Sequence, residues 1–150
     1  MPFAIRPLTP FLGAEILDFD PREAFDAAKR AELVAALQEH RVLLFRAKPL
    51  NEEQQLRLTQ VAGVLTYRGY GNYTDPNKKS SLVSNAHQEG LFGDGELSFH
   101  SDLSFTPHIL KARSLHALIL PSYEDAGGET LFSDVQAAYD ELDPELKAKV

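Results

Sequence analysis

One tripeptide of the sequence, His100-Ser101-Asp102, carries two side chains that bind divalent metal ions. In a β-strand, side chains two residues apart point to the same side, so this imidazole and this carboxylate would face one metal ion together. A carboxylate and two histidines form the facial triad of non-haem iron(II) oxygenases, which leaves coordination positions open. When only the spacing is considered, a His-x-Asp sequence is more often a hydrogen-bonded pair on the surface than a metal site. Both interpretations stay open.

The other histidines are weaker candidates for chemistry. His40 is expected at the end of a helix, where a cation suits the negative end of the helix dipole. His116 falls in an expected strand and is typical of a core or near-core histidine. His87 and His108 fall in expected loops, where a solvated histidine is the common case.

Composition narrows the classes of function. The chain of 150 residues has 15 basic and 22 acidic side chains, a formal charge of −7, and no basic stripe to displace counterions from nucleic acid. The absence of cysteine excludes disulfide scaffolds, thiolate metal sites and cysteine nucleophiles. No apolar run reaches the ~18–20 residues of a membrane span, and the first residues lack a signal-peptide pattern. We therefore expect a cytoplasmic protein that binds neither nucleic acid nor membranes.

The first part of the chain predicts short strands and two helices. Apolar pairs between prolines and glycines predict strands within residues 3–19. Asp20-Pro21 is a typical helix start, with a capping residue before a proline at the first helical position. The apolar run at 42–45 predicts a strand that is buried on both faces. Asn51 then predicts the N-cap of a second helix.

The second part predicts a long polar loop, then strands and short helices. Residues 67–95 are rich in Gly, Asn, Asp, Pro, Lys and Ser and contain one strand-like piece at 81–84. Connections of this length in compact domains are commonly functional or mobile. Further strands are expected at 97–100, 114–120 and 130–132, and further helices from Ser133 and from Asp143. Together, these predicted elements indicate several helices packed on a strand-rich core.

The residues around the tripeptide carry a family resemblance. Residues 93–105, GDGELSFHSDLSF, resemble the metal-binding segment of the taurine dioxygenase family, iron(II)- and 2-oxoglutarate-dependent oxygenases that include the dioxygenases degrading phenoxyacetate herbicides. Further matches follow in the family's order: 39–46 looks like its early strand and 50–63 like the helix after it. Pro121, followed by 127–132 and 137–139, looks like the segment after the metal motif. The ordered set covers nearly the whole chain and is more specific than any single motif.

The resemblance implies roles for individual residues. His100 and Asp102 would be the catalytic iron ligands, and Thr130 would donate a hydrogen bond to a carboxylate of 2-oxoglutarate. A hydrogen bond to such a charged acceptor is worth about 1.5–3 kcal/mol. The family's second histidine ligand and its 2-oxoglutarate-binding arginine lie beyond residue 150. Candidates for the substrate pocket are Asn85, Glu96 and Phe105, with the loop around 70–73 closing over it.

The resemblance also implies a fold and a reaction. The fold would be mainly β with flanking helices, a double-stranded β-helix (jelly-roll) dioxygenase core that is incomplete in this chain. Residues 1–150 would be the N-terminal portion of a single dioxygenase domain, and a homo-oligomer is compatible with it. The reaction would oxidise, typically hydroxylate, a small organic substrate, with iron(II), dioxygen and 2-oxoglutarate, which is decarboxylated to succinate.

Two alternatives of other classes stay open. The chain could be a truncated or degenerate relative that does not catalyse and serves as a binding or assembly module. The residues that follow 150 would discriminate this case, because catalysis needs a further histidine and arginine there. A divalent-metal hydrolase using His100, Asp102 and another histidine would instead be active without 2-oxoglutarate.

Overall fold

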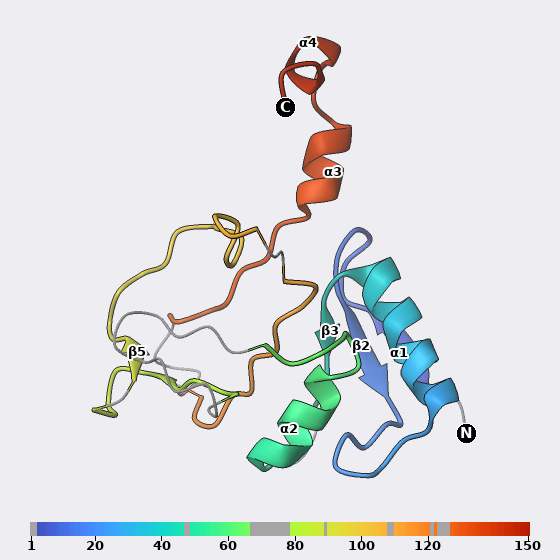
Figure 1. The fold of residues 1–150 in the computed structure, drawn as a ribbon, viewed down its shortest axis with the longest axis vertical. Coiled ribbons are helices and arrows are strands. Elements are labelled where there is room, and N and C mark those ends of the chain that lie inside the picture. The colour runs from blue at the N-terminus through green and yellow to red at the C-terminus, as the bar shows by residue number, and fades with distance from the viewer. Residues whose placement is uncertain are drawn as a thin grey trace. The chain divides into compact units, whose positions relative to one another are not determined.

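The computed structural model of the chain describes residues 3–46, 49–66, 79–88, 90–107, 110–120, 122 and 127–150. The chain divides into two compact units (Figure 1). The first unit holds Met1–Phe19, Ala27–Arg46 and Pro121–Val150, and the second holds Asp20–Asp26 and Ala47–Leu120. None of the helices in the described ranges is both long and apolar enough to cross a membrane.

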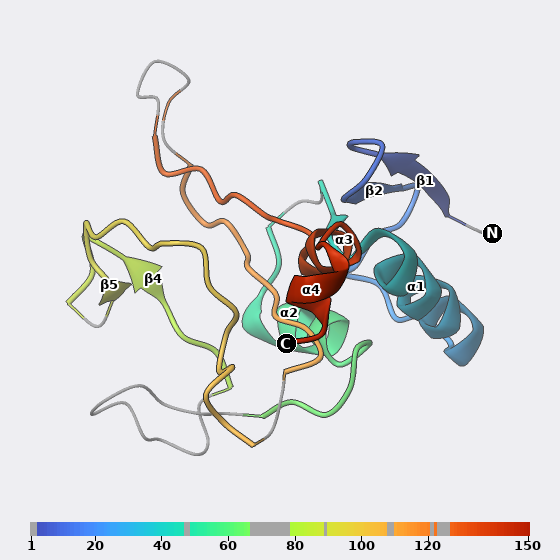
Figure 2. The ribbon, with the colours of Figure 1, turned by 90° about the horizontal axis from the view of Figure 1, so that it is seen from above.

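The first unit contains a three-stranded sheet of order β1-β2-β3. Strands β1 (Ala4–Pro7) and β2 (Ala14–Leu17) pair antiparallel as a hairpin (Figure 2). Helix α1 (Ala27–His40) leads from β2 toward β3 (Leu43–Leu44), which pairs parallel with β2. The strands predicted within 3–19 and 42–45 are confirmed, although β3 is shorter than expected and only half-buried.

The core of the first unit lies between β2 and α1. The ring of Phe19 stands 6.0 Å from that of Phe3 and 5.8 Å from that of Phe45, so three aromatic side chains form one cluster. Buried apolar side chains of β2 and α1 complete this core: Ala14, Ile16, Leu33 and Ala36. The central strand β2 is thus the most enclosed element of the unit, which is usual for the middle strand of a sheet.

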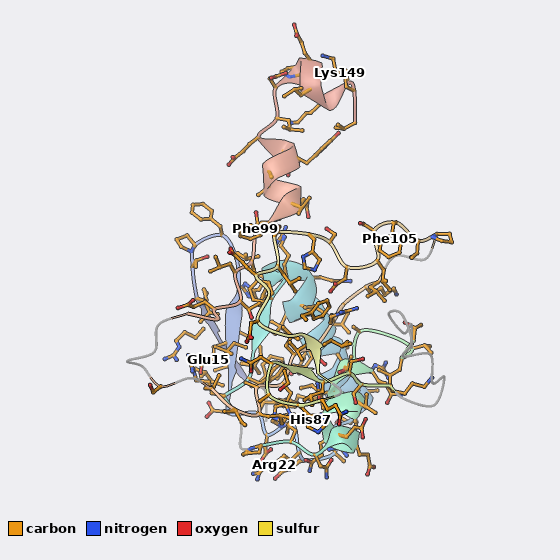
Figure 3. All side chains as sticks on the ribbon, turned by 90° about the vertical axis from the view of Figure 1, so that its left-hand side faces the viewer. Glu15, Arg22, His87, Phe99, Phe105 and Lys149 are labelled. Atoms are coloured by element: carbon orange, nitrogen blue, oxygen red, sulfur yellow. The ribbon has the colours of Figure 1, made fainter. Side chains whose placement is uncertain are left out.

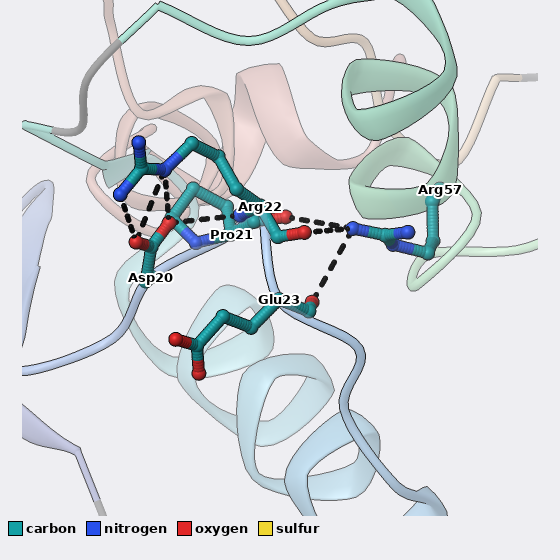
Figure 4. Close-up of polar contacts among 5 residues, drawn as sticks. All are labelled: Asp20, Pro21, Arg22, Glu23 and Arg57. Carbon is teal, nitrogen blue, oxygen red and sulfur yellow. Dashed lines mark hydrogen bonds and ion pairs between the residues drawn. The ribbon is translucent and has the colours of Figure 1, made fainter.

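Helix α1 begins at Ala27, so the start predicted at Asp20-Pro21 is wrong. Asp20 forms a local turn instead: its Oδ1 accepts a hydrogen bond from the backbone N–H of Arg22 at 2.9 Å. Nη2 of Arg57 donates to the carbonyl oxygens of residues 21–23 (Figure 4). These contacts hold residues 21–23 as a turn, and α1 begins only after it.

Helix α2 (Glu52–Thr59) of the second unit begins as predicted. Asn51 Oδ1 accepts from the backbone N–H of Gln54 at 2.9 Å, and Gln54 Oε1 accepts from that of Asn51 at 2.9 Å. This reciprocal capping box satisfies two backbone donors that the first turn leaves without helical partners.

Strands β4 (Val83–Ser84) and β5 (Leu91–Phe92) pair parallel in the second unit (Figure 2). Strand β4 confirms the strand-like piece at 81–84. The strands expected at 97–100, 114–120 and 130–132 are wrong, because none of these segments joins a sheet in the described chain. A strand needs a hydrogen-bonding partner, and no described segment supplies one to them.

Two short helices of the first unit follow. Helix α3 (Val135–Asp140) is capped by Asp134, one residue after the predicted Ser133, and α4 (Pro144–Lys147) is capped by Asp143 as predicted. Asp134 also pairs with Arg41, with Nε and Oδ2 2.9 Å apart. The described chain therefore shows small sheets and helices, while the jelly-roll core stays a prediction.

Candidate metal site

The His100-Asp102 pair lies in a loop of the second unit rather than on the predicted strand, and Asp102 is the first residue of a turn. The backbone N–H of Thr106 donates to the carbonyl oxygen of Leu103 at 3.0 Å, which closes the turn just after Asp102. Leu103 is only 6% exposed and has a φ of 54°. A left-handed backbone is unfavourable for leucine, so burial of this side chain holds the turn that presents Asp102.

The two predicted ligand side chains lie close together beside this turn. Nε2 of His100 lies 3.4 Å from Oδ1 of Asp102. The side chains are 53% and 30% exposed, so a small ion can reach both. The proximity predicted from the sequence is therefore found, although strand alternation is not its cause.

A backbone contact fixes the orientation of the His100 ring. Nδ1 lies 2.7 Å from the carbonyl oxygen of Ser98, which can only accept a hydrogen bond. Nδ1 therefore carries the proton, and in the neutral ring Nε2 keeps the lone pair that a metal ion needs. Metal-binding histidines are commonly oriented in this way by a backbone carbonyl.

Arg113 is a residue of this site that the sequence reasoning missed. Its Nε lies 3.0 Å from Oδ2 of Asp102, the carboxylate oxygen that does not face His100. An arginine that precedes an apolar run carries no motif, so no signal in a single sequence identifies this contact.

The two donors fit a divalent metal ion. Such ions hold nitrogen and oxygen ligands at about 2.0–2.2 Å, so two neighbouring ligands at a right angle stand about 3 Å apart. The 3.4 Å between Nε2 of His100 and Oδ1 of Asp102 is close to this spacing. Imidazole with carboxylate is a donor set that suits iron(II). No group of three or more histidine, aspartate or glutamate side chains suited to a metal occurs in the part of the chain that the structure describes.

Thr130, the predicted partner of 2-oxoglutarate, belongs to the first unit, whereas His100 and Asp102 belong to the second. Its side chain is exposed on an extended segment after Gly127 and Gly128. Its relation to the histidine-aspartate pair therefore stays a prediction.

The candidate substrate residues lie in the second unit. Asn85 follows β4, and its Nδ2 donates to Oδ1 of Asp94 at 2.7 Å. Glu96 is exposed, and Phe105 is 80% exposed, with its ring projecting outward (Figure 3). Their role as pocket residues stays a prediction, and the loop at 70–73 lies outside the described residues.

The remaining histidines largely take the expected places. His40 is the last residue of α1, and His87 is exposed in a loop. His116 is partly buried, and its Nε2 accepts a hydrogen bond from the backbone N–H of Leu50 at 3.3 Å. His108 lies outside the described residues.

Comparison with known proteins identifies the family. The family described as "Taurine catabolism dioxygenase TauD, TfdA family" matches residues 4–150. The chain belongs to this TauD/TfdA family, which confirms the resemblance carried by residues 93–105.

Two curated relatives illustrate the match. The alpha-ketoglutarate-dependent 2,4-dichlorophenoxyacetate dioxygenase of Cupriavidus pinatubonensis is 28% identical over 168 residues, covering 100% of this chain and 56% of the relative. The (S)-phenoxypropionate/alpha-ketoglutarate-dioxygenase of Sphingobium herbicidovorans is 30% identical over 150 residues, covering 99% of this chain and 50% of the relative. The chain thus spans about half the length of the curated relatives it matches.

A solved structure supports the fold. The crystal structure of a proposed alpha-ketoglutarate dependent 2,4-D dioxygenase from Burkholderia xenovorans aligns with a TM-score of 0.67 and 24% identity. The alignment covers 99% of this chain and 50% of that structure. The described chain therefore has the fold of the corresponding half of a dioxygenase of this kind.

Proposed function

We propose that residues 1–150 form the N-terminal portion of a single iron(II)- and 2-oxoglutarate-dependent dioxygenase domain with a jelly-roll core. Membership in the TauD/TfdA family and the names of the relatives support this function. Exposed apolar side chains support the proposal that residues 1–150 are only a portion of the domain, because apolar side chains of a domain are normally covered by the rest of its core. Three of these side chains follow one another just before residue 121: Leu118, Ile119 and Leu120, which are 66%, 91% and 76% exposed.

One observation carries the site: Nε2 of His100 and Oδ1 of Asp102 lie 3.4 Å apart, with the ring oriented by the Ser98 carbonyl. In the proposal these two atoms are iron(II) ligands. The bound iron(II), with 2-oxoglutarate and dioxygen, supplies the oxidising chemistry, in which 2-oxoglutarate is decarboxylated to succinate. The chain holds the ligand atoms at a fixed spacing before the metal arrives, so little ordering is needed on binding.

The proposal extends to cosubstrate and substrate. The Thr130 hydroxyl donates to a carboxylate of 2-oxoglutarate, which helps to hold a dianion in one orientation. The substrate is a small organic molecule, typically hydroxylated, and Asn85, Glu96 and Phe105 are the candidate residues for its pocket. The sequence match to dioxygenases named for phenoxyacetate and phenoxypropionate substrates makes aryloxy acids the first compounds to test.

An anaerobic titration of the full-length protein, which also supplies the ligands expected beyond residue 150, with iron(II) and 2-oxoglutarate tests the site; this full-length protein is the parent of all variants below. Chelation of 2-oxoglutarate by protein-bound iron(II) produces a visible charge-transfer band, and we expect this band in the parent and its loss in His100→Ala and Asp102→Ala. Circular dichroism of each variant serves as the control for folding.

Two outcomes would contradict the proposal. A folded protein without the band would favour the non-catalytic binding module. Metal-dependent hydrolysis that needs no 2-oxoglutarate would favour the hydrolase alternative.

A further inference from the structure

The two carboxylate oxygens of Asp102 have different partners. Oδ1 faces Nε2 of His100 at 3.4 Å, and Oδ2 lies 3.0 Å from Nε of Arg113. The Arg113 side chain is 40% exposed, so it is held by this contact at the surface rather than by burial. A carboxylate that is free to rotate about its terminal torsion would present either oxygen, or both, to an ion.

The chain next to each partner of this ion pair, Arg113 and Asp102, is fixed by other contacts. On the Arg113 side, the hydroxyl of the next residue, Ser114, lies 2.7 Å from that of Thr59 on α2. Nε2 of Gln55, also on α2, donates to the same Ser114 oxygen at 3.4 Å. On the other side, buried Leu103 holds the turn that follows Asp102. The geometry of the ion pair is therefore set by α2 and by the turn.

We propose that Arg113 is a positioning residue for Asp102. Its guanidinium holds Oδ2 and so presents Oδ1, next to Nε2 of His100, to a divalent metal ion. This inference rests on the metal site of the proposed function. Partners that orient metal ligands typically change metal affinity by about 10–100-fold when they are removed.

The direction in which metal affinity changes when Arg113 is removed distinguishes a positioning role from a purely electrostatic one. A positive charge near a cation site repels the cation, so its removal alone would strengthen metal binding. Positioning predicts the opposite, because loss of Arg113 frees the Asp102 carboxylate to rotate. Lys111 provides the matched control, since it lies on the same segment and Lys111→Ala removes the same charge.

The experiment titrates the full-length parent, with the ligand expected beyond residue 150 present, with Mn(II), a divalent ion that accepts carboxylate ligands, and follows free Mn(II) by electron paramagnetic resonance. We expect about 10-fold weaker binding for Arg113→Met. We expect an intermediate affinity for Arg113→Lys, which keeps the charge without the planar fork. Lys111→Ala should bind as tightly as the parent or more tightly.

Thermal unfolding of the same variants checks that the fold is retained. The midpoints should stay within about 4 °C of the parent, because an exposed ion pair contributes about 0–1 kcal/mol. If Arg113→Met does not fold, the Mn(II) affinity of Arg113→Lys is compared with that of Lys111→Ala instead, and Arg113→Lys should bind more weakly.

Each contrary result has a distinct meaning. If His100→Ala abolishes Mn(II) binding but Arg113→Met binds as tightly as Lys111→Ala, the metal site stands and the role of Arg113 is wrong. The same holds if Arg113→Met weakens only the binding of 2-oxoglutarate, because Arg113 would then contact the cosubstrate. No Mn(II) binding by the parent would overturn both the proposed function and this inference.

Discussion

Nδ1 of His100 donates a hydrogen bond to the carbonyl oxygen of Ser98, 2.7 Å away, and this bond turns Nε2 toward the Asp102 carboxylate. The two ring nitrogens thus have different roles: Nδ1 fixes the orientation of the ring, and Nε2 is available to a metal ion. Variants that keep only one of these two atoms test the roles separately.

His100→Asn should fold like the parent and lose metal binding. An asparagine amide nitrogen takes roughly the place of Nδ1 and can keep the bond to Ser98, but asparagine has no atom at the Nε2 position. His100→Gln is the matched variant, because it places an amide near Nε2 and loses the Ser98 bond. Mn(II) affinity and the thermal unfolding midpoint measure the two properties. Mn(II) binding by His100→Asn at the parent's affinity would refute the assignment of Nε2 as a ligand.

Removing Glu15 of β2 and removing its two arginine partners should have unequal effects on the free energy of unfolding. Its side chain is 5% exposed and pairs with Arg6 and with Arg46, whose side chains are 61% and 71% exposed. Removing both arginines leaves a buried carboxylate without a charged partner, and we expect a loss of about 3 kcal/mol in the free energy of unfolding. Glu15→Gln leaves two solvated arginines and should cost less.

Urea denaturation of Glu15→Gln and of the Arg6→Ala, Arg46→Ala double variant measures this difference. Equal losses in the two proteins would show that burial of the carboxylate does not control the energetics of this cluster.

Asp134 has two separable roles, as the N-cap of α3 and as the partner of Arg41. Asn is about as good an N-cap as Asp, so Asp134→Asn should lose only the ion pair, at about 0–1 kcal/mol. Asp134→Ala should lose the cap as well, a further cost of about 1 kcal/mol. Urea unfolding of both variants checks the order. Identical midpoints would show that the cap contributes nothing.

Arg57 links α2 to the turn at residues 21–23 through three carbonyl oxygens. Arg57→Met keeps the apolar stem and removes these contacts. Only the contact to the carbonyl oxygen of Arg22, at 2.6 Å, is short, and one hydrogen bond to a charged group contributes about 1.5–3 kcal/mol. The buried Nε of Arg57 has no hydrogen-bond partner within the described ranges, so methionine also relieves a cost. We therefore expect a net loss of about 1 kcal/mol.

Chemical denaturation measures the loss, with Lys149→Met as the control for removing an exposed positive charge. If the Arg57 variant is as stable as this control, the carbonyl contacts do not stabilise the turn.

Local signals in the sequence predicted local structure well. Asn51 and Asp143 cap the helices that they were expected to cap, because an N-cap depends on residues within one turn. Asp20 fails for a long-range reason. Asp20 does accept from the backbone N–H of Arg22, but Arg57 of α2 binds the carbonyls of residues 21–23 and holds them as a turn. A contact between residues so distant in the chain leaves no trace in the local pattern.

The strands show the same limit. Residues 114–120 have strand composition, yet Ser114 bonds to Thr59 and His116 to Leu50 in place of a neighbouring strand. At the site, the tripeptide predicted that the side chains of His100 and Asp102 lie together, whereas the contact of Arg113 with Asp102 could not be found without the structure. The family match confirms the resemblance, and the metal-binding roles of these residues are the proposal that the titrations test.

The segment of residues 115–120, which is apolar except for His116, also has a consequence for experiments in solution. Ile119 is 91% exposed, and its neighbours are leucines and an alanine without a charge among them. Short exposed segments with high β-propensity, low net charge and no proline favour pairing between copies of a chain, and so aggregation. Upstream, Lys111 and Arg113 place positive charges that oppose such stacking. Variants of Arg113 can therefore raise self-association, and metal titrations are best made at the lowest protein concentration that detection permits.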